Sequence, residues 1–192
     1  MSKDGFDVAG LLKFKQALED MKDEAPEIIE ELVVGEGVYA VKQAKLICKN
    51  DTPDIVDTGS YRLNWHCGNK AVPAWESETE HDGKPPKKSG TTYKIDVYNN
   101  LDYAKHLEYG FRSHFVPAKY LGASFIARYM AAKGLDEPPE GIYVGPKNGY
   151  VKGRFVLKRA IKRTEITQQA RLSRKWNKKV KEYLAGRGFE GL

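Results

Sequence analysis

Two short segments of this 192-residue chain contain side chains that could carry acid–base chemistry. The first is Asp57-Thr58-Gly59, the triplet with which aspartic proteases present one of two carboxylates that share a proton. A working pair needs a second triplet or a dimer, and the chain contains this triplet once. Asp, Thr and Gly also stabilise turns through local hydrogen bonds, and glycine tolerates a positive φ. We therefore predict that the triplet locks a turn and is not a protease site.

The second segment is Tyr103 to Gly110, in which His106 and Glu108 could form an acid–base pair. Residues two apart on a helix point in different directions, so these two side chains cannot serve one substrate unaided. Asp102 precedes the segment and is predicted to cap a short helix there, which Gly110 ends. The segment is therefore predicted to be a packed, capped helix.

The other ligand-type residues do not form a metal motif. Cys48 and Cys67 are the two cysteines, and His66 lies next to Cys67. Zinc ligands usually come in closely spaced pairs such as Cys-x-x-Cys, which this sequence lacks. Both cysteines are predicted to be reduced thiols on apolar faces, and no cofactor is expected. A hydrolase that uses Asp57 with His66 or His106 has little support, because no nucleophile elbow or phosphate-binding glycine loop is present.

The elements that would position these residues begin with a predicted pair of helices in residues 1–50. Apolar residues at three- and four-residue spacing from Phe6 to Met21 indicate an amphipathic helix. Ala25-Pro26 is predicted to end it and to start a second helix, because proline suits the first turn. The second helix has an apolar stripe of small and branched residues. These are Ile29, Val33, Gly37, Ala40, Ala44 and Ile47.

Residues 55–100 are predicted to form the strands of a small, mostly antiparallel sheet. Tyr61 to Val72 is a candidate for one strand, and Thr91 to Asn99 alternates apolar and polar residues as a second strand would. Between them, residues 76–90 are rich in Glu, Lys, Pro, Gly and Ser. That composition predicts a mobile loop.

Residues 101–150 add the short central helix and an insert. Within the insert, Lys119 to Lys133 is predicted to be a helix that Gly134 ends, and residues 142–144 a brief strand. A long basic helix is predicted from Phe155 onward. Together the elements predict an α+β fold, with residues 1–192 as a single domain.

The formal net charge of +6 is unevenly distributed. Residues 151–192 contain 13 Lys and Arg residues against three acidic ones, whereas the rest of the chain is net acidic. Such an asymmetry favours contacts between complementary subunits or with nucleic acid. Basic residues around an aromatic side chain can also bind phosphates, which leaves a DNA- or RNA-binding accessory protein as an alternative function. Candidates for the charged interface are Arg171, Arg174, Lys175, Trp176, Lys178 and Lys179.

No apolar run approaches the roughly 20 residues that span a bilayer, so no membrane contact is expected. The first residues lack the basic-then-apolar pattern of a signal peptide. The chain is therefore expected to be made in the cytoplasm and to stay there, or in a particle assembled there.

Three segments in order resemble the gp-ten-like family of tail-completion, or head–tail joining, proteins of long-tailed DNA bacteriophages. Ile55 to Tyr61 is similar to a Pro-x-Asp-Thr-Gly-x-Leu turn, although Pro53 here lies further upstream. Tyr103 to Gly110 fits Tyr-Ala-x-x-(apolar)-Glu-(aromatic)-Gly, and Gly153 to Ala160 fits a Phe-(apolar)-(apolar)-x-x-Ala helix start. The segment between the last two is longer than in compact members. Residues expected to lock turns, pair charges or pack are Asp57, Thr58, Gly59, Arg62, Tyr103, Glu108, Tyr109, Gly110 and Phe155.

The resemblance implies a non-enzymatic structural protein of the virion neck, between capsid and tail. It would complete the tail end and join it to the head as a ring, expected to be hexameric. Its neighbours would be head-connector, tail-terminator and tail-tube proteins, with contact to the phosphates of packaged DNA as a further option. The protein is expected to be made in the host bacterial cytoplasm and to associate weakly until it meets its platform.

Overall fold

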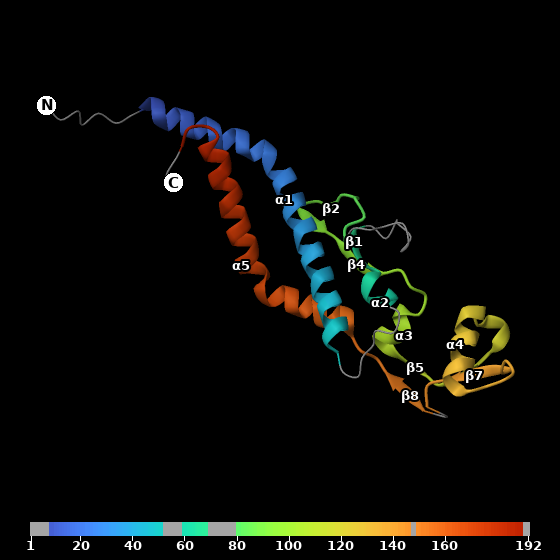
Figure 1. Cartoon of the computed structure of the whole chain (residues 1–192). Coiled ribbons are helices and arrows are strands. Elements are labelled where there is room, and N and C mark those ends of the chain that lie inside the picture. The colour runs from blue at the N-terminus through green and yellow to red at the C-terminus, as the bar shows by residue number, and fades with distance from the viewer. Residues whose placement is uncertain (1–7, 52–58, 69–79, 147–148, 190–192) are drawn as a thin grey trace. The chain divides into compact units, whose positions relative to one another are not determined.

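The α+β class is confirmed by the computed structural model, which describes residues 8–51, 59–68, 80–146 and 149–189 (Figure 1). Side chains are described from Leu12 onward. The chain divides into two compact units: unit 1 contains residues 1–101 and 156–192, and unit 2 contains residues 102–155. The prediction of a single domain stays a prediction. No described helix combines the length and the apolar character that crossing a membrane requires.

Unit 1 begins with one continuous helix in place of the predicted helix pair. Helix α1 spans Val8–Asn50, 43 residues, with Pro26 inside it. The prediction of a break at Ala25-Pro26 is wrong. An interior proline costs a hydrogen bond and kinks a helix, but contacts from Arg187 to Glu24 and from Lys179 to Glu31 hold the turns on both sides of it. Figure 1 shows the ribbon of α1 changing direction along its course, as a proline inside a helix causes.

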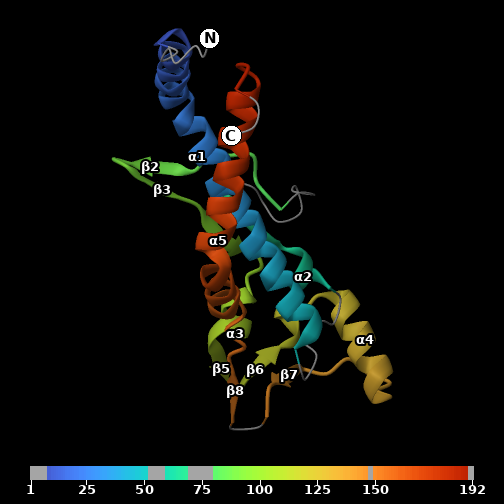
Figure 2. The ribbon, with the colours of Figure 1, turned by 90° about the vertical axis from the view of Figure 1, so that its left-hand side faces the viewer.

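The long basic helix is confirmed as α5, Val156–Ala185, which lies alongside α1 (Figures 1 and 2). The two helices run antiparallel, because Asp51 pairs with Arg159 near one end and Glu31 pairs with Lys179 further along. The second half of the predicted α1 stripe is buried in this core. Its fully enclosed residues include Ala40, Ala44 and Ile47 of α1, with Val156 and Ala160 of α5.

A two-stranded sheet also packs on α1. Strand β1, Trp65–Gly68, is buried at all four residues and pairs antiparallel with β4, Asp96–Asn99. Gly37 permits this close approach, since a Cβ there would lie 3.1 Å from the Cys67 Sγ atom. The small residue at position 37 of the apolar stripe is therefore explained by the packing of β1 against α1.

Three strand and loop predictions in unit 1 differ from the structure. Residues Ser60–Leu63 form a short helix, α2, because Gly59 turns the chain with a φ of 84° before β1 begins. The predicted strand 91–99 is split into β3, Thr92–Lys94, and β4. The described part of the predicted loop 76–90 contains β2, Lys87–Ser89, which pairs with β3, and His81, which bridges to β1.

Unit 2 contains two antiparallel strand pairs, β5–β8 and β6–β7, and two helices. The helix ended by Gly134 and the brief strand are confirmed as α4 and β7, whereas the predicted Asp102 cap is wrong because Tyr103 occupies the cap position. Only Glu108 and Ile142 are buried among the described residues of this unit. Its elements are α3 Ala104–Tyr109, β5 Gly110–Arg112, β6 His114–Pro117, a 3₁₀ turn Ala118–Tyr120, α4 Ala123–Lys133, β7 Gly141–Val144 and β8 Tyr150–Lys152.

Candidate functional site

Two of the three motif segments meet in unit 2. The backbone N–H of Arg154 donates to the Leu107 carbonyl at 2.7 Å, and that of Phe155 donates to the Glu108 carbonyl at 3.1 Å. Two residues beyond Glu108, Gly110 pairs with Lys152 in the β5–β8 ladder. We call residues 107–110 and 152–155 the motif junction. Two segments more than 40 positions apart in the sequence are therefore joined by backbone hydrogen bonds. This contact explains why the two motifs occur together in one chain.

Glycines make the motif junction possible. Gly110 has a φ of 82° and a ψ of 175°, a region that side chains other than glycine rarely enter. A Cβ on Gly110 would lie 2.4 Å from the Val151 carbonyl oxygen, and a Cβ on Gly153 would lie 2.4 Å from that of Glu108. The two strands therefore approach more closely than any side chain at these positions allows.

The side chains of the motif junction divide into buried and exposed groups. Glu108 is buried, whereas Tyr109 is 64% exposed although its carbonyl accepts a hydrogen bond of 2.7 Å from the Tyr150 hydroxyl. Phe155 is 44% exposed and has a φ of 51°, a strained value for a phenylalanine. Tyr103, at the start of α3, is 43% exposed. The motif thus presents aromatic side chains on a rigid backbone.

A small apolar pocket of about 320 Å³ lies beside α3. The ring of His106 contacts that of Phe111 edge-on at 5.7 Å, and Phe111 contacts His114 at 5.9 Å. Glu108 is not among the lining residues, so the pocket does not bring the candidate acid–base pair together. The lining residues are Tyr103, His106, Leu107, Phe111, His114 and Val144.

The first motif segment is only partly described. Asp57 and Thr58 lie outside the described residues, so the predicted turn lock stays a prediction. Gly59 has the positive φ that the turn interpretation expects, and Arg62 is half-buried on α2. His66, the proposed hydrolase partner of Asp57, is buried in β1 with its ring 6.1 Å from that of Tyr98.

Both cysteines are buried free thiols, as predicted. Burial raises the pKa of the Cys48 thiol to about 11 and that of Cys67 to about 12. Since the thiolate is the nucleophile and the metal ligand, both side chains are inert near neutral pH. Among the described residues, no three His, Cys, Asp or Glu side chains form a group that could hold a metal ion.

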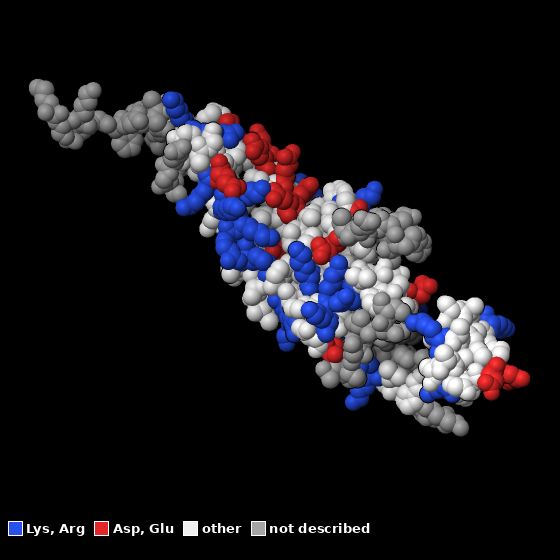
Figure 3. Space-filling model, in the orientation of Figure 1, with Lys and Arg blue, Asp and Glu red and all other residues white. Residues whose placement is uncertain are grey.

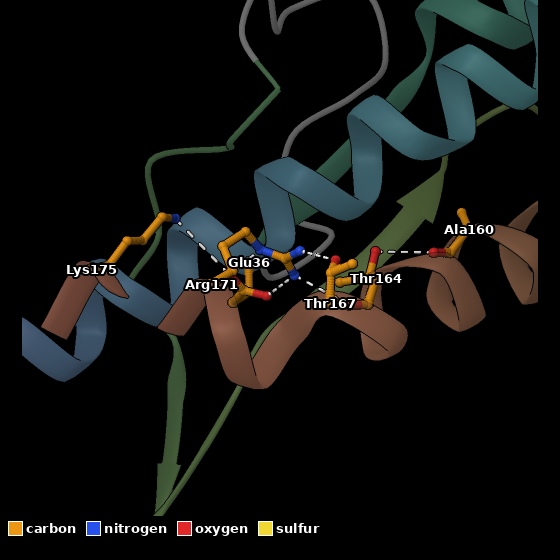
Figure 4. Close-up of polar contacts among 6 residues, drawn as sticks. All are labelled: Glu36, Ala160, Thr164, Thr167, Arg171 and Lys175. Carbon is orange, nitrogen blue, oxygen red and sulfur yellow. Dashed lines mark hydrogen bonds and ion pairs between the residues drawn. The ribbon is translucent and has the colours of Figure 1, made fainter. Parts of the chain in front are cut away.

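The basic helix contributes one buried ion pair, between Arg171 of α5 and Glu36 of α1 (Figure 4). The Arg171 guanidinium donates to both Glu36 carboxylate oxygens, from Nε at 2.8 Å, and to the Thr164 carbonyl at 3.2 Å. It also lies 3.7 Å from the centre of the Tyr39 ring. The hydrogen bond to Glu36 raises the pKa of Arg171, so the guanidinium stays protonated. Lys175 approaches the same carboxylate at 3.9 Å.

Sequence reasoning missed Glu36. Its signal is an acidic residue inside the apolar stripe, between Val33 and Ala40, where no solvent-facing position is expected. A buried carboxylate requires a cation, and α5 is the basic element that packs there.

The other predicted interface cations are also placed by the structure. Lys179 pairs with Glu31 of α1 at 2.6 Å, and Lys178 pairs with Glu182 within α5 at 3.6 Å. Arg174 is exposed, whereas Trp176 is half-buried. In Figure 3 cations gather along α5 and acidic side chains along the adjacent part of α1. Some of the basic residues near the C-terminus of the sequence therefore pair with acidic residues of α1 inside unit 1.

Comparison with protein families gives one match. Residues 13–110 match the model described as "Bacteriophage HK97-gp10, putative tail-component". The match covers just over half of the chain, from α1 to Gly110 at the motif junction. No curated protein and no solved structure matches the chain.

Proposed function

The chain belongs to the Bacteriophage HK97-gp10 family of phage tail components, and from that membership we propose that it is a structural protein of the virion neck. It completes the end of the tail and joins the tail to the head. The observation that carries this proposal is the motif junction, which holds exposed aromatic side chains on a backbone that glycines fix. Aromatic residues on rigid elements are typical of protein interfaces.

The proposed role is non-enzymatic. Within the described residues, His106 lines an aromatic pocket to which Glu108 does not contribute, and both thiols have raised pKa values. The glycines of the motif junction allow its backbone conformation, and its aromatic residues present apolar surface. An assembly role needs these properties and no reacting group.

We further propose that the protein acts as a ring of identical copies, six in number. Head-to-tail contacts between unlike surfaces close into rings, so one chain must carry two different interfaces. The partners are head-connector, tail-terminator and tail-tube proteins. Because few residues of unit 2 are buried, its interfaces form on assembly, and we expect a monomer at micromolar concentration in sedimentation. A stable ring of the isolated protein under these conditions would contradict that expectation.

The test is particle assembly in cells that lack the protein. Electron microscopy should show separate heads and tails, and supplying the wild-type chain should restore joined particles. Normal numbers of joined particles without the protein would overturn the proposal.

A single substitution ties this role to the motif junction. Tyr109→Ala removes a 64% exposed ring and leaves the hydrogen bond that its carbonyl accepts. We expect about a tenfold drop in joined particles, the effect of losing one interface residue worth about 1.4 kcal/mol. Tyr120→Ala is the matched control, because Tyr120 is 72% exposed on the 3₁₀ turn, outside both motif segments.

Contact with packaged DNA is a second candidate, favoured by the cations that α5 leaves exposed. Arg174 is exposed, and the Lys178 side chain is 76% exposed. Such contact would involve phosphates and would weaken steeply with salt. The double variant Arg174→Glu/Lys178→Glu should then reduce salt-sensitive retention on duplex DNA. Equal retention of the variant and the wild type would exclude this role for the two residues.

A further inference from the structure

Strands β2 and β3 form an exposed two-stranded ribbon in unit 1. Every strand residue of this ribbon is exposed except Tyr93, which is half-buried. A turn of two residues, 90–91, joins the strands, and Gly90 has a φ of 59°, which such tight turns favour at their first position. Figure 2 shows the two strands projecting from the helices of the unit. We call residues 87–94 the β2–β3 ribbon.

The pairing register decides which side chains of the β2–β3 ribbon share a face. Residues directly opposite each other in an antiparallel pair point to the same side, and successive residues alternate. Lys87 is opposite Lys94. Ser89 is opposite Thr92 on the same side, two residues closer to the turn. We call the side formed by these four residues the lysine face.

The other side of the β2–β3 ribbon is directed toward α1. It has Lys88 opposite Tyr93, with the Lys88 Nζ atom 5.2 Å from the centre of the Tyr93 ring. The hydrogen bond to Tyr93 raises the pKa of Lys88, and the charge of Glu30 on α1 also contributes. Two positions after Tyr93, Ile95 contacts α1 at Gly37, where a Cβ would lie 3.0 Å from the Ile95 Cδ1 atom. The lysine face therefore points away from α1.

The lysine face brings like charges together. Two like charges directly opposite each other destabilise a strand pair. Asp96 compensates one of them, because its Oδ2 atom lies 2.7 Å from the Lys87 Nζ atom. Lys94 makes no ion pair within the described residues, and residues 83–96 contain four lysines against this one acid. An anion bound at the lysine face would relieve the repulsion.

The composition of the lysine face favours phosphates over a protein surface as that anion. Protein interfaces are depleted in lysine and have apolar or aromatic side chains at their centre, and the lysine face consists of two lysines and two hydroxyl residues. Phosphate oxygens, in contrast, accept hydrogen bonds from lysine, serine and threonine side chains. These are the three residue types that the register brings together.

We infer that the lysine face of the β2–β3 ribbon binds the phosphate backbone of duplex DNA, independently of base sequence. The neck role identifies DNA as the nucleic acid, and in this respect the inference rests on the proposed function. The site is separate from the α5 cations considered above, so the two contacts can be tested independently.

Fluorescence anisotropy with a short labelled DNA duplex and the full-length protein tests the contact. Lys87→Gln/Lys94→Gln should weaken binding by about tenfold or more at about 0.1 M salt, because two phosphate contacts are lost. The slope of log affinity against log salt concentration should become shallower by about two. Lys42→Gln/Lys49→Gln is the matched control, because both lysines are exposed on α1 and the change in net charge is the same. This control should bind DNA like the wild type.

Asp96→Asn tests the contact by a gain of affinity, which misfolding cannot imitate. The substitution frees Lys87 and removes the negative charge beside the lysine face, so DNA binding should tighten by about threefold or more. Lys87→Arg/Lys94→Arg keeps both charges and should bind like the wild type. Circular dichroism checks that the variants remain folded.

Two results would overturn the inference. One is a Lys87→Gln/Lys94→Gln variant whose DNA affinity and salt dependence equal those of the wild type, as expected if α5 makes the whole contact. The other is loss of particle joining in this variant while its DNA binding is intact, which would assign the lysine face to an acidic protein surface.

The particle assay separates this inference from the proposed function. If Lys87→Gln/Lys94→Gln weakens DNA binding but particles join normally without the whole protein, the DNA contact stands and the neck role fails. If the variant binds DNA like the wild type while joining requires the protein, the DNA contact is wrong and the neck role stands.

Discussion

Gly110 is constrained in two ways within the motif junction, by its backbone conformation and by close backbone contacts. Residues other than glycine rarely adopt its φ of 82° and ψ of 175°, and its missing Cβ leaves room for the Val151 carbonyl. The same position ends α3 and starts β5, so the helix and the ladder both depend on it. The glycine in the sequence motif therefore marks a backbone requirement and not a contact surface.

We predict that Gly110→Ala destabilises unit 2 by about 1–3 kcal/mol, the cost of a residue held in a forbidden backbone region. Hydrogen exchange of the β5 and β8 amides should accelerate, while that of α1 is unchanged. Gly122→Ala is the control, because a Cβ there meets no atom within 4 Å. Equal protection of the β5 and β8 amides in the two variants would show that the β5–β8 ladder accommodates a Cβ at position 110.

The buried ion pair between Glu36 and Arg171 is a second place where single residues determine stability. Their side chains are 8% and 9% exposed, so solvent screens them little. Removing one partner leaves the other charge buried, at a cost of about 3–5 kcal/mol, whereas removing both is far less harmful. We therefore predict a large fall in the free energy of unfolding for Arg171→Met and a smaller one for Glu36→Met/Arg171→Met. Chemical denaturation measures both, and a double variant less stable than the single one would contradict the argument.

Among the elements, α1 depends on α5 for its continuity through Pro26. Before the proline, Arg187 lies 3.4 Å from Glu24, and the rings of Phe14 and Phe189 meet edge-on at 5.4 Å. After it, Lys179 pairs with Glu31. Helix α5 and the residues that follow it therefore hold both arms of α1.

We predict that Pro26→Ala stabilises unit 1 by about 1–3 kcal/mol, because alanine restores the missing helix hydrogen bond and favours the helix. Thermal unfolding followed by circular dichroism measures the gain. Glu27→Ala, one position further on at an exposed site, serves as the control for a change of side chain alone. A loss of stability in Pro26→Ala would mean that the bend is itself required for packing.

The sequence predicts those parts of these elements that local chemistry decides. Gly110 and Gly134 end helices where expected, and the apolar stripe of α1 is buried from Ala40 onward. Long-range contacts decide the rest. Continuity at Pro26 depends on residues more than 150 positions away, and the Glu36–Arg171 pair spans 135 positions. The hydrogen bond between the motif segments, from Phe155 to Glu108, likewise cannot be predicted from the spacing of apolar residues.

At the scale of the whole molecule, the two ends of the chain together make unit 1. Helix α1 supplies Ala44 and Ile47 to a core that Val156 and Ala160 of α5 complete, although all of unit 2 lies between these helices in the sequence. The family match ends at Gly110, before α4 and α5 begin. The matched region therefore requires the unmatched C-terminal helix for its own core.

We predict that a chain shortened to residues 1–155 fails to fold unit 1. Its longest helix would expose the stripe that α5 covers, and an isolated helix with a proline inside is unstable in water. The helical circular dichroism signal should fall by more than the 30 residues of α5 explain, and denaturation should lose its cooperative transition. The full-length variant Ile166→Lys is the control, because this 74% exposed residue of α5 contributes nothing to the core. A shortened chain that still unfolds cooperatively would show that α1 and the β1–β4 sheet form a core without α5.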